Sequence, residues 1–285
     1  MCSERTRILF TAALALAAAA PCAAGVINDV PSCYTANKIS AKKPQLEREL
    51  FVVIDQTTVF DDKLKRSISE NVWENLQANT AFTIVRFSAF SQGRYTEVVT
   101  TGVIEPPLPD AIRDETSTKL IGKFDACMAG QLKFARDHAI KAVSASLSDA
   151  ASDLVKSDIL AALRDVSARV KASPAKAKLV FLASDMLENS SVSSFYAPGN
   201  RVRKVAVEPE LAAAAKAGLM ADFGGGVAVH VIGAGLLAPQ GPGAKPNYRD
   251  AATLSALADF WTRYLEKSGA QLVQFGAPAL LQPVR

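Results

Sequence analysis

The feature of this sequence that most constrains its fold is a short apolar run at residues 50–54, which ends on Asp55. An unbroken apolar run of this length predicts a strand buried on both faces, as in a parallel sheet. A second such run, at residues 179–183, is followed by Ser184 and Asp185. Ligands of open α/β sheets bind beyond the carboxyl ends of the strands, so the two strand ends predict one candidate site.

The rest of the chain alternates between helical and strand patterns. Leu64, Ile68, Val72 and Leu76 recur at four-residue spacing and predict a helix over residues 61–77. The pattern predicts further helices at 125–143, 157–171, 209–220 and 249–267, and further strands at 81–90, 94–104, 227–232 and 271–275. Because a short Gly-containing connection joins the strands at 81–90 and 94–104, that pair is predicted to be an antiparallel hairpin at the sheet edge.

These elements predict an α/β fold: a doubly wound, mostly parallel six-stranded sheet with one antiparallel edge strand and helices on both faces. One domain is expected over residues 45–278, after an extended N-terminal arm at 25–44 and before a C-terminal tail at 279–285. Prolines and a Thr/Ser cluster predict a loop at 105–123, of a length that usually means function or disorder.

Three large or polar side chains lie within apolar patterns. Trp73 and Trp261 occur at helical spacing with aliphatic residues, and His230 lies inside an apolar strand pattern. The two tryptophans are therefore predicted to pack in the core, and the histidine is predicted to be a satisfied core or edge residue rather than a ligand.

The N-terminal residues have the pattern of a secretory leader. Arg5 and Arg7 precede an apolar run at residues 8–20, which is too short for a permanent membrane span, and small residues follow it. We predict a signal peptide at 1–24, a mature start near Gly25, and a bacterial protein exported to the periplasm or secreted. Lipidation of Cys22 is the alternative, which Pro21 disfavours. No other segment is apolar and long enough to span a membrane.

Two cysteines, Cys33 and Cys127, remain after removal of the leader. In an oxidising compartment one disulfide between them is the economical prediction, with two free thiols as the alternative. The chain has no CxxC motif and only two histidines, so zinc, haem and thioredoxin-like chemistry lack a ligand set. A net charge of +4 without a basic run argues against nucleic acid as a partner.

The arrangement resembles the von Willebrand factor type A (vWA) domain, a doubly wound sheet of about six strands with an antiparallel edge strand. The metal-ion-dependent adhesion site of that family combines Asp-x-Ser-x-Ser after the first strand, a Thr before a helix, and an Asp after the fourth strand. Asp55 and Thr57 match the first motif, while Val59 stands where the family has its second hydroxyl and cannot coordinate. Ser157 is similar to the helix-leading Thr, and Asp185 is similar to the third-loop Asp.

Together with the predicted leader, the resemblance implies an exported, non-enzymatic protein-binding module without catalytic residues. It implies a divalent cation, Mg²⁺ or Mn²⁺, at Asp55, Thr57, Ser157 and Asp185, because Mg²⁺ prefers hard oxygen ligands and keeps some of its waters. An open coordination position would accept a carboxylate from a protein partner, which we expect in an envelope or secreted assembly.

Two other interpretations of Asp55 stay open. In the simplest, Asp55 caps the following turn and Thr57 hydrogen-bonds the backbone, as Asp and Thr often do after strands. In the other, Asp55-x-Thr57 resembles the start of a haloacid-dehalogenase-like phosphotransferase with Asp55 as the nucleophile. Such enzymes need a second acidic pair near a later strand, whereas the strand at 227–232 ends on Gly233-Ala234-Gly235.

The leader gives a first testable prediction. N-terminal sequencing of the exported protein is expected to begin near Gly25, because the small residues before it suit signal peptidase. A blocked N-terminus with a lipid on Cys22 would contradict this.

Overall fold

A six-stranded sheet forms the centre of the computed structural model, which describes residues 28–88, 96–150, 157–197, 201–236 and 250–285. The strand order is β3-β2-β1-β4-β7-β8. Its strands are β1 (Arg48–Asp55), β2 (Thr80–Phe87), β3 (Glu97–Ile104), β4 (Ala177–Ala183), β7 (Val227–Ile232) and β8 (Ala270–Gly276). Only the β2–β3 pair in this sheet is antiparallel. The predicted fold class and the vWA-like arrangement are confirmed.

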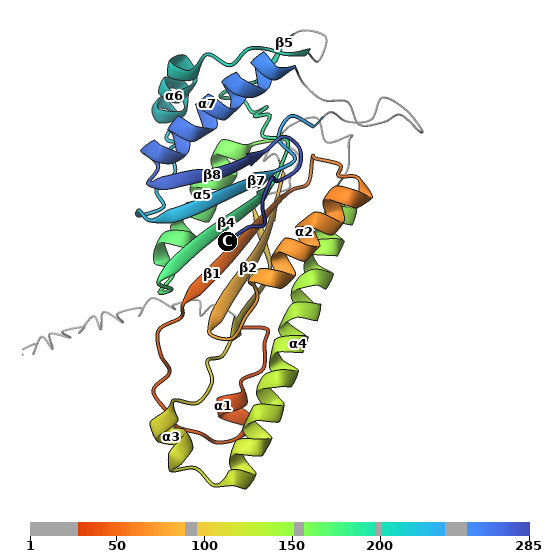
Figure 1. Cartoon of the computed structure of the whole chain (residues 1–285). Helices are drawn as coiled ribbons and strands as arrows, with labels where there is room; N and C mark the ends of the chain where they lie inside the picture. Colours follow the sequence, from red (N-terminus) through yellow and green to blue (C-terminus); the bar gives the residue numbers. More distant parts are fainter. Residues whose placement is uncertain (1–27, 89–95, 151–156, 198–200, 237–249) are drawn as a thin grey trace, which may run out of the picture.

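Helices cover both faces of this sheet (Figure 1). On one face α2 (Asp62–Asn75) and α4 (Thr118–Ser148) pack against Leu50, Val52 and Ile54 of β1. On the other face α5 (Ile159–Ala172), α6 (Val207–Lys216) and α7 (Ala251–Lys267) form a core with Phe51 and Val53. Because alternate side chains of a strand point to opposite faces, β1 supplies both cores, and its apolar run has no polar interruption.

Three of these helices begin with an aspartate cap. Asp61, Asp158 and Asp250 each accept a hydrogen bond from a backbone N–H in the first turn of α2, α5 and α7 respectively. Such a cap satisfies a donor that the helix leaves free and is worth about 1 kcal/mol. It also fixes the residue at which each helix starts.

The segment at 105–123 is not the long loop that the sequence predicted. It contains the short helix α3 (Asp110–Asp114), and α4 already begins at Thr118 and continues to Ser148 rather than covering only 125–143. The first turns of α4 lie beyond the end of the sheet, at the bottom of Figure 1. There they pack against the N-terminal arm instead of a continuous core, so their apolar spacing is too sparse to indicate a helix.

The N-terminal arm is tied to α4 by the predicted disulfide. Cys33 of the short helix α1 (Cys33–Ala36) bonds Cys127 of α4. Next to it, the ring of Tyr34 meets that of Phe124 edge-on at 5.0 Å, and both side chains are buried. The arm is therefore partly helical, not extended throughout, and it forms a small second core with α4.

Glu105, directly after β3, anchors this small core. Its buried carboxylate accepts hydrogen bonds from Ser32 Oγ at 2.6 Å, the Cys33 N–H at 2.7 Å, Lys43 Nζ at 2.5 Å and Gln131 Nε2 at 3.0 Å. Burial acts to raise the pKa of Glu105, but the hydrogen bonds, led by that from Lys43, outweigh it and hold the pKa below its ordinary value. The charged carboxylate thus holds α1 against the end of the sheet.

The arm also covers one edge of the sheet. The Asp29 N–H donates to the carbonyl of Thr101 at 3.0 Å, and the Val103 N–H donates to Asn28 Oδ1 at 3.0 Å. An uncovered edge strand is a template for unwanted pairing, so these contacts protect β3.

Two of the three side chains that the sequence placed in the core are there. Trp261 is fully buried, and His230 is only 2% exposed. His230 Nδ1 lies 3.2 Å from Gln274 Nε2, whereas Nε2 is buried without a hydrogen-bond partner among the described residues, so the histidine is not fully satisfied as predicted. Trp73, however, is 39% exposed and lies under the guanidinium of Arg136, 5.0 Å from it. Its predicted core role is wrong because Trp73 is on the edge of the apolar stripe of α2 that Ile68 and Val72 form.

In the part of the chain that the structure describes, no helix is both long and apolar enough to cross a membrane. The predicted signal peptide, Cys22 and Gly25 lie outside the described residues. The domain limits at 45 and 278 stay a prediction.

Gly102 of β3 gives a prediction about stability. It pairs with Phe82 of β2, and a Cβ added to it would overlap the Phe82 ring and lie 2.7 Å from Val30 Cγ2. Gly102→Ala is expected to lower the free energy of unfolding by about 1–3 kcal/mol, because the buried ring has to shift. Thermal and urea unfolding measure this.

Gly130→Ala on α4 is the matched control, because nothing lies within 4 Å of its added Cβ. It is expected to raise stability by up to about 1 kcal/mol through helix propensity. Equal melting temperatures for the two variants would contradict the proposed clash.

Candidate functional site

Asp55 is the last residue of β1, and its carboxylate is fully buried. Oδ1 accepts from the backbone N–H of Thr57 at 2.9 Å and from Thr57 Oγ1 at 2.7 Å. Oδ2 accepts from Ser157 Oγ at 3.0 Å and from Ser184 Oγ at 2.8 Å. Three loops therefore place hydroxyl groups on one carboxylate, and we call Asp55, Thr57, Ser157 and Ser184 the Asp55 cluster.

The loop after β1 is fixed by contacts that continue the sheet. The Gln56 N–H donates to the carbonyl of Phe87 at 2.8 Å, and Gln56 Nε2 donates to the carbonyl of Ser146 at 2.6 Å. Thr58 Oγ1 accepts from the Asp185 N–H at 3.1 Å, which joins the first loop to the third. The turn at Thr57 is thus held from both sides, and its hydroxyl has a defined direction.

The structure brings together three of the four residues predicted for the site: Asp55, Thr57 and Ser157. Asp185 lies in the third loop, as predicted, but its Oδ1 accepts from the Leu187 N–H at 2.9 Å within its own loop. Ser184, one residue earlier, supplies the hydroxyl that reaches Asp55. Sequence reasoning missed Ser184 as a site residue, although a hydroxyl directly after a buried strand was its signal.

Burial raises the pKa of Asp55, while the hydrogen bonds from Thr57, Ser184 and Ser157 act in the opposite direction. All four of the hydrogen-bonding positions of an ionised carboxylate have a donor. The simplest interpretation of the sequence, in which Asp55 caps its turn, therefore describes the bond from the Thr57 N–H well. It does not describe the Thr57 hydroxyl, which donates to Asp55 and not to the backbone.

The donor chemistry fits a hard divalent cation. A hydroxyl that donates its proton to Asp55 keeps two lone pairs, and no side chain of the described residues donates to those of Thr57 and Ser157, so they could face a metal ion. Among the described residues, no group of three or more His, Cys, Asp and Glu side chains is placed to hold a metal. Any cation at the Asp55 cluster would thus have at most two carboxylates beside it and would depend on hydroxyl oxygens and water for the rest, which Mg²⁺ accepts.

The geometry argues against Asp55 as a nucleophile. A carboxylate that attacks phosphorus needs an exposed oxygen with a free lone pair. Both oxygens of Asp55 are buried and each accepts two hydrogen bonds. The phosphotransferase interpretation therefore requires the whole cluster to open.

A second buried carboxylate, that of Glu188, lies beside the Asp55 cluster and was not anticipated from the sequence. Its Oε2 accepts from the backbone N–H groups of Ile159 at 2.8 Å and Leu160 at 3.0 Å, at the start of α5. Its Oε1 has no hydrogen-bond partner among the described residues. Burial raises the pKa of Glu188 to about 8. A hydrogen bond with Ser190 and the two backbone N–H groups act against this increase, and the nearby charge of Asp158 adds to it.

Comparisons with known proteins give similarity of overall shape only. No family model and no curated protein matches the sequence. Among solved structures, the PilB minor pilin from Streptococcus sanguinis has a TM-score of 0.42 and 12% identity, and the match covers 83% of this chain and 58% of the pilin. The chain thus corresponds to little more than half of that protein.

Two structures from Bacteroides species are similar over most of their own length. An aerotolerance-related membrane protein from Bacteroides fragilis has a TM-score of 0.35 and 14% identity, with 80% of this chain and 92% of that chain covered. The conserved hypothetical protein BatB from Bacteroides thetaiotaomicron has a TM-score of 0.36 and 15% identity, with 80% and 90% covered.

The raised pKa of Glu188 predicts a pH dependence of stability. The folded protein keeps the proton up to about pH 8, whereas the unfolded chain loses it near the ordinary value of 4.5. Folding therefore retains a proton between these values, and the free energy of unfolding falls as the pH rises through that range. Glu188→Gln is expected to remove up to about 3 kcal/mol of the fall between pH 5.5 and 8.

Melting curves of wild type and Glu188→Gln across this pH range measure the effect. Glu208→Gln, the same chemical change at a surface carboxylate that pairs with Arg263, is the control and should follow wild type. Parallel curves for wild type and Glu188→Gln would show that Glu188 is ionised in the folded state.

Proposed function

We propose that this chain is an exported, non-enzymatic protein-binding module that recognises its partner at the carboxyl edge of a vWA-like sheet. The observation that carries the proposal is the convergence of hydroxyls from three loops on the buried carboxylate of Asp55. Such an edge is where open α/β sheets bind ligands. Together with the four satisfied positions on Asp55, this favours binding over covalent chemistry.

The proposal includes a divalent cation, Mg²⁺ or Mn²⁺. Thr57 and Ser157 would hold it through the lone pairs that face away from Asp55, and Asp55 would orient their hydroxyls. Asp185 would contribute from the third loop, directly or through water. The cation would supply an open position for a carboxylate of the partner protein.

Export is supported by the disulfide between Cys33 and Cys127, because disulfides persist in oxidising compartments. With the predicted leader, it favours a periplasmic or secreted protein. The partner is then a protein of the envelope or of a secreted assembly.

Calorimetric titration with Mn²⁺ tests the cation. Wild type is expected to bind it, and Thr57→Val is expected to lower the affinity about ten-fold or more, because the methyl group that replaces the hydroxyl cannot coordinate. Thr57→Ser is the matched control, because it keeps the hydroxyl and should bind as wild type does. Thr57 is half-buried, so the protein should tolerate both changes.

Two results would contradict the cation. One is the absence of any Mn²⁺-dependent heat or thermal stabilisation in wild type. The other is equal affinity of the Val and Ser variants, which would place the metal away from Thr57. Either result would leave the binding module without a metal at Asp55.

A further inference from the structure

The last residues of the chain cross the face of the sheet from β8 to α2 (Figure 1). At β8, the Gln282 N–H donates to Gln274 Oε1 and its carbonyl accepts from Gln274 Nε2, both at 3.1 Å. At α2, the Val284 N–H donates to Asn71 Oδ1 at 2.7 Å and its carbonyl accepts from Asn75 Nδ2 at 3.0 Å. Side-chain amides thus hold both backbone groups of two residues in this segment.

We call residues 282–285 the tail, and Asn71, Asn75 and Gln274 the tail groove. The fold itself orients two of these amides. Asn75 Oδ1 accepts from Arg48 at 2.8 Å, which directs its NH₂ group to the tail, and Asn71 Nδ2 donates to the Ser67 carbonyl at 2.8 Å, which leaves its oxygen for Val284. A groove whose donors and acceptors are already fixed binds an extended chain at a small entropic cost.

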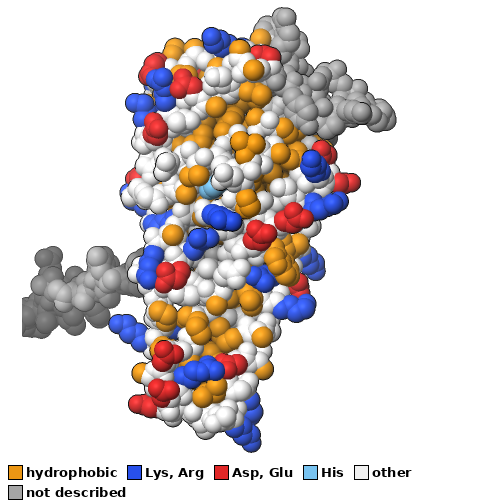
Figure 2. All heavy atoms as spheres, viewed as in Figure 1, with side chains coloured by type: hydrophobic (Ala, Val, Ile, Leu, Met, Phe, Trp, Pro, Cys, Tyr) orange, Lys and Arg blue, Asp and Glu red, His pale blue; other side chains and the backbone are white. Residues whose placement is uncertain are grey.

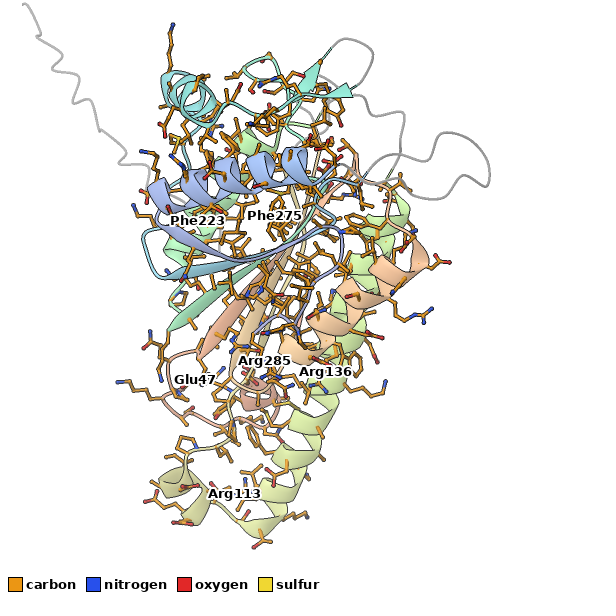
Figure 3. All side chains as sticks on the ribbon, turned by 45° about the horizontal axis from the view of Figure 1, so that its top comes forward. Glu47, Arg113, Arg136, Phe223, Phe275 and Arg285 are labelled. Atoms are coloured by element: carbon orange, nitrogen blue, oxygen red, sulfur yellow. A yellow bond between two sulfur atoms is a disulfide. The ribbon has the colours of Figure 1, made fainter. Side chains whose placement is uncertain are left out.

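The hydrogen bonds in the tail groove are made to backbone groups of the tail, so they do not depend on which amino acids the tail contains. Val284 is the one apolar side chain of the tail that is buried, at 3% exposure, whereas the adjoining Leu281 is 97% exposed. Figure 3 labels Arg285, the end of the tail, on the face that α2 covers. Recognition through the main chain with one side-chain anchor is how proteins capture extended peptides of varied sequence.

The C-terminal segment leaves a space unfilled between itself and α2. A hollow of about 240 Å³ lies between α2 and residues 280–283, and its lining includes the exposed carboxylates of Glu70 and Glu74. Neither glutamate forms an ion pair with a described residue. On this face of the molecule, apolar side chains gather in the upper half and charged ones lie along the middle (Figure 2). A basic side chain at the position of Leu281 would complement the two acids.

We infer that the tail groove is a peptide-binding site, which the tail occupies in cis and from which a partner's extended segment displaces it. That segment carries Lys or Arg three residues before a small aliphatic residue, which replaces Val284. The site is separate from the Asp55 cluster and does not depend on the proposed function.

Fluorescence anisotropy with a labelled peptide of residues 279–285 tests the inference on the full-length chain. Val284→Asp places a charge in the buried anchor position and releases the tail. It is expected to bind the peptide at least about ten-fold more tightly than wild type, in which the tethered tail competes at high effective concentration. Leu281→Asn replaces an exposed apolar side chain by an uncharged polar one, leaves the buried anchor in place, and should bind no better than wild type.

A second peptide with Leu281→Lys tests the charge preference. It is expected to bind the Val284→Asp chain about two- to five-fold more tightly than the parent peptide, a gain typical of exposed ion pairs. Glu70→Gln combined with Glu74→Gln in the same chain should abolish this gain and leave binding of the parent peptide unchanged.

Gln282→Pro is a second variant that should release the tail. It removes the backbone N–H that donates to Gln274 Oε1 and leaves the groove residues unchanged. It should also increase peptide binding, and it replaces Val284→Asp in the experiment if that variant does not fold.

Equal binding to released, control and wild-type chains would overturn the inference, as would no binding to a folded released chain. A wild-type dimer by sedimentation that takes up no peptide would assign the groove to tail exchange between two copies instead.

Discussion

The buried carboxylate of Asp55 is the interaction on which the arrangement of this molecule's carboxyl edge depends. Moving an unpaired carboxylate from water into a protein interior costs several kcal/mol, so the surrounding loops must supply donors. They do so from three directions, through Thr57, Ser157 and Ser184. The loops after β1 and β4 and the start of α5 are therefore fixed relative to one another by a single group, which gives the edge a defined shape.

The start of α5 is held by two buried carboxylates with different surroundings. Ser157 donates to Asp55, and two residues later the first free N–H groups of the helix donate to Glu188. Asp55 has a donor for every lone pair, whereas one oxygen of Glu188 has none among the described residues. Burial raises the pKa of both carboxyl groups, to about 8 for Glu188, so the start of the helix rests on two groups that burial biases toward the protonated form.

Sequence patterns anticipated the strands of the main sheet and the convergence of Asp55, Thr57 and Ser157, because parallel strands must deliver their carboxyl ends to one edge. These patterns predicted that Asp185 belongs to the site, but the residue that contacts Asp55 is Ser184, because the direction of a side chain after a strand depends on the loop that follows. They missed the first turns of α4, which pack against the arm and not the main core. The contacts of residues 282–285 could not be predicted from the sequence either, because side-chain amides that bind a backbone segment produce no periodic pattern.

The contact between Ser184 and Asp55 bears on the charge that the proposed cation would carry. Among the described residues, the hydrogen bonds of the cluster gather three hydroxyl groups around one carboxylate, that of Asp55. With Asp185 acting through water, a divalent cation there would have one acid beside it and would keep a net positive charge, which a buried setting of low dielectric strengthens. A carboxylate of the proposed partner would neutralise that charge, whereas a neutral amide or hydroxyl would leave it uncompensated. Direct coordination by Asp185 would neutralise the cation further and weaken this preference for an acidic group.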